Sequence, residues 1–99
     1  QIAQDANGQI VGVGDMDAQA RQVFANIEAV LKEAGSSFRD VAKITCYVSD
    51  MRHYGAYGKV RSELFPNADI ASATVISPGF VKPDALIEIE TFAVVGCGG

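Results

Sequence analysis

The chain has 99 residues, which is the size of one domain and leaves no room for a second. Hydrophobic residues make up 48% and charged residues 20%, a composition typical of a folded globular protein and not of a disordered one. The 12 acidic side chains outnumber the 8 basic ones and give a net charge of −4, which disfavours nucleic acid and anionic membrane surfaces as partners.

The opening residues, 1–14, predict the tail of one strand, a turn and an extended lead-in to a helix. The turn is expected at Asp5-Ala6-Asn7-Gly8, because Asn and Gly tolerate a positive φ. We interpret Gly12-Val13-Gly14 as a second turn, since it lacks the remaining residues of a phosphate-binding loop.

The most secure element is an amphipathic helix from Asp17 to Ala34. Its apolar positions recur at steps of three and four and therefore share one face; they are Ala20, Val23, Phe24, Ile27, Val30, Leu31 and Ala34. Asp15 or Asp17 is expected to accept the free N–H groups of the first turn, and Gly35 to end the helix.

Further along the chain, the pattern predicts a strand, a second helix and two more strands. Residues 41–48 are β-branched and aromatic without a breaker, which is typical of a strand. Residues 54–64 carry apolar side chains at helical spacing, and Pro66 stops the helix. The two remaining strands are expected at 71–76 and 86–93. This order predicts an α+β fold with two helices on one face of a sheet.

The last strand alternates with a period of two, so that one of its faces is buried. Glu88 and Glu90 lie on the face opposite Ile87 and Ile89. From the residues alone, two interpretations stay open: a polar outer face, or a carboxylate that faces a pocket and exchanges protons there.

Other chemically active side chains form no recognisable motif. The single histidine, His53, has no Cys or Ser arranged beside it as a nucleophile, and we expect no metal site. Cys46 and Cys97 are expected to be reduced thiols in a cytoplasmic protein, since the chain has no apolar run of membrane-spanning length and no secretion-signal pattern. We expect three basic side chains to be solvated charges, with an anion-binding site as the less favoured alternative; they are Lys43, Lys59 and Arg61.

Three motifs in order carry a resemblance that covers nearly the whole chain: DMDAQARQVFANIEAVLKEAG in the first helix, VAKITCYVSDM in the next strand and ALIEIETFA at the end. They resemble the Rid/YjgF family of enamine/imine deaminases, formerly labelled endoribonuclease L-PSP. The resemblance implies one domain over residues 1–99 with a mixed β-sheet and two helices on one face, a YjgF/chorismate-mutase-like fold. It also implies a homotrimer with small-molecule pockets in the clefts between subunits.

The family hydrolyses reactive enamines and imines to a keto compound and ammonia without a cofactor, so we expect no cofactor here. By position in the motifs, Glu88 corresponds to the glutamate that positions the attacking water. Ser72 stands where the family has an arginine that binds the substrate carboxylate, and Thr74 keeps a position that lines the pocket. A serine gives one neutral hydrogen bond in place of two charge-assisted ones, a loss on the order of 10- to 100-fold in affinity.

Two further departures from the family lie on the second helix, where Gly58 and Arg61 stand in place of an asparagine and a tyrosine. The loss of the arginine implies a substrate class without a carboxylate, or a cation recruited from Arg61 or Lys82. The family also begins with a β-hairpin that ends in Ser-Gly-Gln. Gln1 corresponds to that glutamine, so we expect residues 1–99 to lack the hairpin.

Two other functions compete with a deaminase. The first is a trimer that binds or senses a small molecule without turnover, which the serine at position 72 favours. The second is the ribonuclease of the old family label, which is disfavoured because the chain is acidic and has one histidine.

Overall fold

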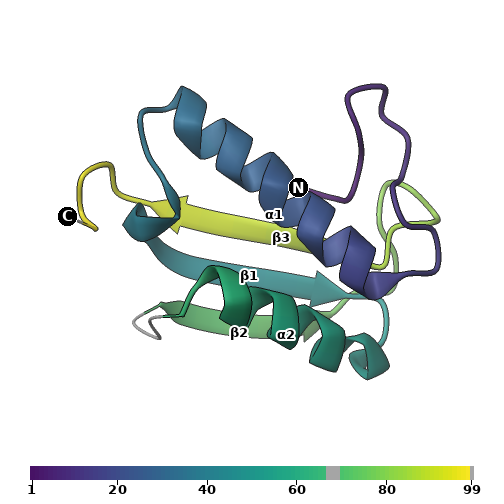
Figure 1. Ribbon diagram of the computed structural model, residues 1–99. Coiled ribbons are helices and arrows are strands. Elements are labelled where there is room, and N and C mark those ends of the chain that lie inside the picture. Colours follow the sequence, from purple (N-terminus) through teal and green to yellow (C-terminus); the bar gives the residue numbers. More distant parts are fainter. Residues whose placement is uncertain (67–69, 99) are drawn as a thin grey trace.

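The computed structural model describes residues 1–66 and 70–98, in which two helices and three strands follow one another in the expected order (Figure 1). Helix α1 spans Met16–Glu33 and helix α2 spans Tyr54–Leu64. The strands are β1 (Val41–Val48), β2 (Ala71–Ile76) and β3 (Ile87–Ala93). Short 3-10 turns at Phe38–Asp40 and Met51–His53 precede β1 and α2. The predicted α+β element order is confirmed.

The sheet is mixed and has the strand order β2-β1-β3. The central strand β1 pairs with β2 in parallel and with β3 in antiparallel orientation. At the start of the chain, Ile2 forms an isolated antiparallel bridge with Glu88 on the outer side of β3. The predicted turn that follows is also present, since Gln4 pairs with Ile10 and Gly8 has a φ of 77°.

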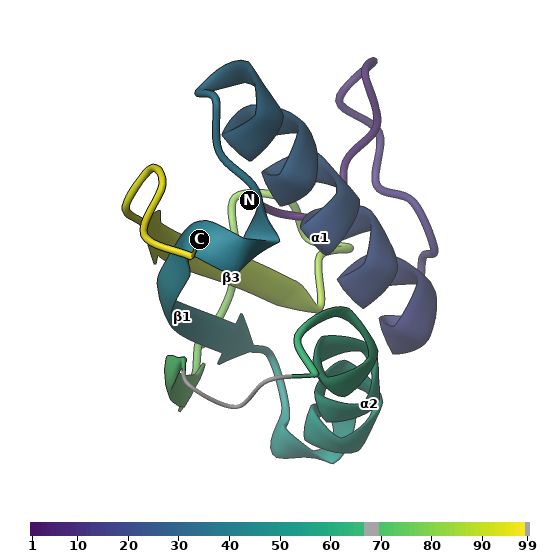
Figure 2. The same cartoon turned by 60° about the vertical axis from the view of Figure 1, so that its left-hand side comes forward.

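Both helices cover the same face of the sheet, and Figure 2 shows them together on one side of the strands. The core between the two layers is centred on Phe24 of α1. Its ring stacks on Tyr57 of α2 at 6.1 Å and meets Phe65 at 5.5 Å between ring centroids. The sheet contributes Ile44, Cys46, Val48, Ile87 and Ile89 to this core. No helix of the described residues covers the other face of the sheet.

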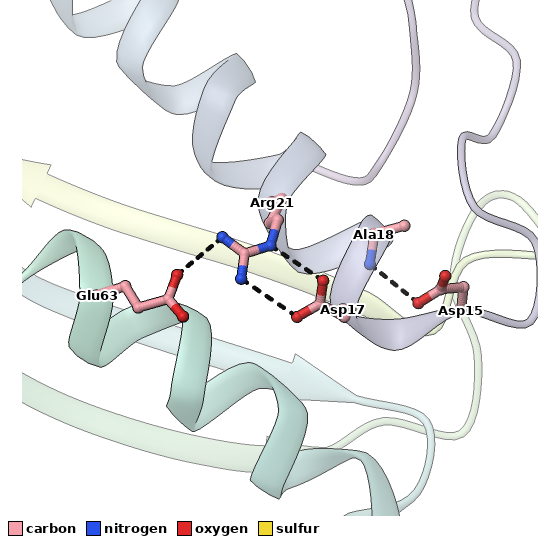
Figure 3. Close-up of polar contacts among 5 residues, drawn as sticks. All are labelled: Asp15, Asp17, Ala18, Arg21 and Glu63. Carbon is pink, nitrogen blue, oxygen red and sulfur yellow. Dashed lines mark hydrogen bonds and ion pairs between the residues drawn. The ribbon is translucent and has the colours of Figure 1, made fainter.

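Helix α1 begins and ends one residue before the predicted bounds of Asp17 and Ala34. Of the two candidate caps, Asp15 is the one used, and its carboxylate accepts a hydrogen bond from the backbone N–H of Ala18 at 3.1 Å (Figure 3). Gly35 takes a positive φ of 76° just after the helix. Val30 belongs to the apolar stripe but remains 56% exposed, because it borders a groove at the outer edge of β3 and is not covered there.

Two sets of polar contacts tie the helices to the rest of the fold. Arg21 of α1 bonds Asp17 at 3.0 Å and reaches Glu63 of α2 at 2.9 Å (Figure 3). The buried amide of Gln19 donates to the carbonyls of Gly12 and Asp84 and accepts from the N–H of Leu86. Gln19 therefore fixes both the entrance to α1 and the loop that enters β3.

The glycine-rich end of the chain is held by Asp40. Its carboxylate accepts hydrogen bonds from the Ser36 hydroxyl and from the backbone N–H groups of Gly96 and Gly98. These donors keep the pKa of Asp40 below its usual range. The tail consequently folds back beside the start of β1.

Candidate functional site

The residues singled out in the sequence lie on two opposite faces of the sheet. On β2, Ser72 pairs with Ile44 and Thr74 pairs with Cys46. Ile44 and Cys46 are fully buried under the helices, and residues paired across neighbouring strands share a face. Ser72 and Thr74 therefore belong to the helix-covered face, although Ser72 is exposed because β2 is an edge strand.

Glu88 belongs to the other face. It pairs with Tyr47 of β1, which lies three residues beyond Ile44 and so points to the side that no described helix covers. Its neighbour across the outer edge of β3 is Ile2. Glu88 is partly buried, whereas Glu90 on the same face is exposed. The Glu88 carboxylate is thus more enclosed than that of Glu90, which agrees with the interpretation that a carboxylate of this strand faces a pocket.

A groove of about 300 Å³ runs along the outer edge of β3, between this strand and the second half of α1. Its lining combines apolar side chains with carboxylates: Gln1, Ile27, Val30, Leu31, Glu88, Ile89, Glu90 and Thr91. Glu88 thus lines a concave surface within one chain.

On the helix-covered face, four side chains from three elements gather into what we call the Arg61 cluster: Cys46 of β1, Tyr57 and Arg61 of α2, and Ser72 of β2. Tyr57 is fully buried, and its hydroxyl has no hydrogen-bond partner among the described residues. The Nε of Arg61 is likewise buried and unpartnered there. Arg61 is partly buried overall and not the fully solvated charge that the sequence favoured.

Burial dominates the electrostatics of this cluster. It raises the pKa of the Cys46 thiol to about 12, so Cys46 is a neutral core residue and not a nucleophile. Burial also raises the pKa of Tyr57, while the nearby Arg61 charge and Ser72 hydroxyl act in the opposite direction. The Tyr57 hydroxyl therefore stays protonated at neutral pH and is available as a hydrogen-bond donor.

Sequence reasoning placed Arg61, Ser72 and Thr74 in the pocket but assigned Tyr57 only to the helical apolar repeat. The i, i+4 spacing of Tyr57 and Arg61 puts both on one side of α2 and is the signal that could have linked them. Lys82, the other candidate cation, is exposed in the loop before β3.

The remaining candidates form no centre. His53 stands just before α2, and its side chain makes no capping hydrogen bond. Lys43 lies over the ring of Phe92 at 5.7 Å, and Lys59 is exposed. Both cysteines are free thiols.

Among residues 1–66 and 70–98, no group of three or more His, Cys, Asp or Glu side chains is placed to hold a metal ion. In the same part of the chain, no helix is long and apolar enough to cross a membrane.

Comparison with known proteins relates this geometry to a family. The family model described as endoribonuclease L-PSP matches residues 1–95. The chain is 42% identical over 91 residues to the 3-aminoacrylate deaminase RutC of Acinetobacter baylyi, and the match covers 92% of this chain and 71% of RutC.

Solved structures show the same relationship. YyfA of Yersinia pestis, a protein of unknown function in the conserved Rid family, superposes with a TM-score of 0.89 at 31% identity, over 96% of this chain and 75% of YyfA. YyfB of the same organism and family gives a TM-score of 0.84 at 35% identity, over 96% of this chain and 74% of YyfB. With sequence motifs, sheet topology and these relatives in agreement, the chain belongs to the Rid/YjgF family, whose model carries the description endoribonuclease L-PSP.

Proposed function

We propose that this protein hydrolyses a reactive enamine or imine of a small molecule and releases ammonia. The observation that carries the proposal is the similarity to RutC, which is named a 3-aminoacrylate deaminase and matches almost the whole chain. Aminoacrylate is an enamine that bears a carboxylate, so this relative is named for the class of reaction that we assign here.

The reaction needs no electron transfer. Transfer of a proton from the nitrogen to the carbon of an enamine gives an imine, and water then adds to the imine carbon. A C–O bond forms, both protons of the water pass to the nitrogen, and the C–N bond breaks as ammonia leaves and a carbonyl remains. The protein has to bind the substrate, orient the water and accept its proton, so we propose no cofactor.

Glu88 is the residue that we propose to position the water. Its carboxylate is partly buried, lies beside Tyr47 and lines the groove along β3. Glu90 on the same strand is exposed to solvent, where a water molecule is held less firmly. A carboxylate at the wall of a groove is suited to accept a proton from a water molecule bound there.

Ser72, Thr74 and Arg61 are the residues that we propose to bind the substrate. They belong to the opposite face of the sheet from Glu88, so one chain cannot bring all of them to a single small molecule. A second chain could bring the Glu88 face of one copy against the exposed edge strand β2 of another. This split supports our proposal of a homotrimer with the ligand in the cleft between subunits.

This protein has Ser72 at the position where deaminases of the family bind the substrate carboxylate through an arginine. We propose that the substrate differs from that of such enzymes, or that another cation takes over the carboxylate. The competing function is a trimer of the same architecture that binds a small molecule without turnover.

The test is imine hydrolysis. An amino-acid oxidase generates 2-imino acids, semicarbazide traps them, and the protein is added at increasing concentration. Protein-dependent loss of the semicarbazone with matching gain of keto acid and ammonia is the expected result. No change, from a sample whose native mass is that of a trimer, would overturn imino-acid deamination and favour the binding function.

A further inference from the structure

An amide side chain of α1 holds the backbone segment that borders Glu88. The Nδ2 of Asn26 donates to the carbonyl oxygens of Ile2 at 3.2 Å and of Gln4 at 2.9 Å. Gln22, one turn earlier on the helix, donates to the Oδ1 of Asn26 at 2.8 Å and so orients the NH2 group of Asn26 toward the two carbonyls. Asn26 therefore fixes the start of the chain against α1.

Ile2 makes the surroundings of Glu88 different from those of Glu90. It is 6% exposed and forms an isolated antiparallel bridge with Glu88 across the outer edge of β3. Within residues 1–66 and 70–98, no bridge partner faces Glu90 across this edge. Glu88 is partly buried and Glu90 is exposed. The enclosure of the Glu88 side chain thus depends on where Ile2 lies.

A second amide of α1 fixes the approach to Glu88 along the chain. Gln19 is fully buried; its Nε2 donates to the carbonyl of Asp84 at 2.9 Å, and its Oε1 accepts from the N–H of Leu86 at 2.8 Å. Leu86 directly precedes β3, and Glu88 is the second residue of that strand. Gln19 lies seven residues before Asn26, which is about two turns, so both amides project from the same side of α1.

We propose that Asn26 and Gln19 are positioning residues for Glu88. They act through the backbone of Ile2 and Leu86 and do not touch the substrate. Side chains that act on a substrate depend on such supporting hydrogen bonds, because a displacement of about 1 Å costs on the order of 10²-fold in rate. The holding of Glu88 stands by itself, whereas its consequence for turnover rests on the proposed function.

The holding is tested without turnover by adding a neutral, soluble gadolinium chelate to isotope-labelled protein and measuring the relaxation of the glutamate side-chain signals. Glu90 should be relaxed more strongly than Glu88 in the parent protein, because it is more exposed. Asn26→Ala should raise the relaxation of Glu88 toward that of Glu90. Gln9→Ala, which removes an exposed amide from the same N-terminal segment, should change neither signal.

Asn26→Asp gives a second test of the same contact. The side chain keeps its shape, but an acceptor oxygen replaces the NH2 donor, so the two carbonyls lose their partner. This variant should expose Glu88 in the same direction as Asn26→Ala. Relaxation of Glu88 that is equal in the parent protein and in both folded variants would overturn the positioning role.

Turnover separates positioning from a general effect on folding. Asn26→Ala should lower kcat for 2-imino acids on the order of 10- to 100-fold and change KM less. It should lower kcat no further in Glu88→Gln, because the group that Asn26 positions is then absent. Gln19→Met should show the same coupling to Glu88. A loss of folded protein would instead lower turnover by the same factor in both backgrounds, and that result would overturn the proposal.

The failure of this inference differs from the failure of the proposed function. Greater exposure of Glu88 in Asn26→Ala, in a protein that hydrolyses no imine, would retain the holding of Glu88 and reject the deaminase. Turnover of 2-imino acids that is undiminished in Asn26→Ala would retain the deaminase and reject the positioning role.

Discussion

Ser72 and Glu88 occupy opposite faces of one three-stranded sheet. Ser72 shares its face with Ile44 under the helices, and Glu88 shares its face with Tyr47 on the side that no described helix covers. Ser72 lies on β2 and Glu88 on β3, with β1 between them, so within one chain the two side chains are two strands apart as well as on opposite faces and do not reach the same small molecule. If both residues serve one reaction, they do so from different chains.

This relationship predicts complementation between two inactive variants. Glu88→Gln and Arg61→Met should each lose turnover of 2-imino acids alone. Chains mixed in equal amounts and reassembled should regain about one quarter of the parent activity, because about one site in four then combines an intact Glu88 with an intact Arg61. The measurement is specific activity after co-refolding, with each variant refolded alone as the control. No recovery in mixtures shown to exchange subunits would contradict a shared site.

Replacing Glu88 should separate catalysis from folding. Glu88→Gln keeps the size and shape of the side chain, but it replaces one acceptor oxygen by an NH2 donor and cannot accept a proton, so turnover should fall on the order of 10²- to 10⁴-fold. Glu90→Gln is the matched control, because Glu90 lies on the same face two residues along and is exposed. It should keep nearly full activity. Similar losses in both variants would indicate a general effect of negative charge and would remove Glu88 from its proposed role.

The two thiols should differ sharply in reactivity. Burial raises the pKa of Cys46 to about 12, so its side chain stays a thiol at pH 8, and it is also inaccessible to solvent. Cys97 is exposed. An aromatic disulfide reagent should therefore label one thiol per chain in the native protein and two in denaturant. A Cys97→Ser variant that still reacts quickly in the native state would show that Cys46 is accessible.

Two glycines with the same backbone conformation should respond differently to alanine. Gly8 and Gly12 have φ values of 77° and 70°, so alanine is strained at both by about 1–2 kcal/mol. A Cβ on Gly12 would also lie 2.7 Å from the Cβ of Ala18, whereas one on Gly8 meets open space. The free energy of unfolding should thus fall further in Gly12→Ala than in Gly8→Ala. Urea denaturation measures both, and equal losses would show that α1 shifts to relieve the contact.

Asp40 should make stability depend on acid pH. Its folded-state pKa lies below the ordinary value of 3.8, chiefly because the Ser36 hydroxyl and the N–H groups of Gly98 and Gly96 bond the carboxylate. A group whose pKa is lowered on folding contributes stability above its unfolded pKa, and this contribution is lost as the pH falls through the folded value. Asp40→Asn should lower the melting temperature at pH 7 but narrow the difference between pH 7 and pH 3.

The same variant has a local readout at the end of the chain. Amide hydrogens of Gly96 and Gly98 should exchange faster in Asp40→Asn, because a neutral amide accepts more weakly than a carboxylate. Amides in the middle of β1 serve as the internal control and should keep their protection. Unchanged exchange at Gly96 and Gly98 would show that other contacts hold the tail.

The secondary structure was predictable because its signals are local. The three-and-four repeat around Phe24 defines α1, Asp15 and Gly35 bound it, and the alternation of Ile87 and Ile89 with glutamates defines β3. The motifs on these elements also identified the family. What the chain could not reveal by periodicity was strand register, since pairing joins residues that are dozens of positions apart.

For the candidate site, the sequence by itself determined which residues to consider, and only the tertiary structure decided on which face each of them lies and which of them are buried. Residue types and motif positions nominated Glu88, Ser72, Thr74 and Arg61 as candidate site residues, which remains a prediction. Register then assigned Glu88 to the face opposite the other three, and helix packing buried Tyr57 beside Arg61. Both outcomes depend on which surfaces meet in three dimensions, because burial and face are properties of the packed sheet and not of any single segment.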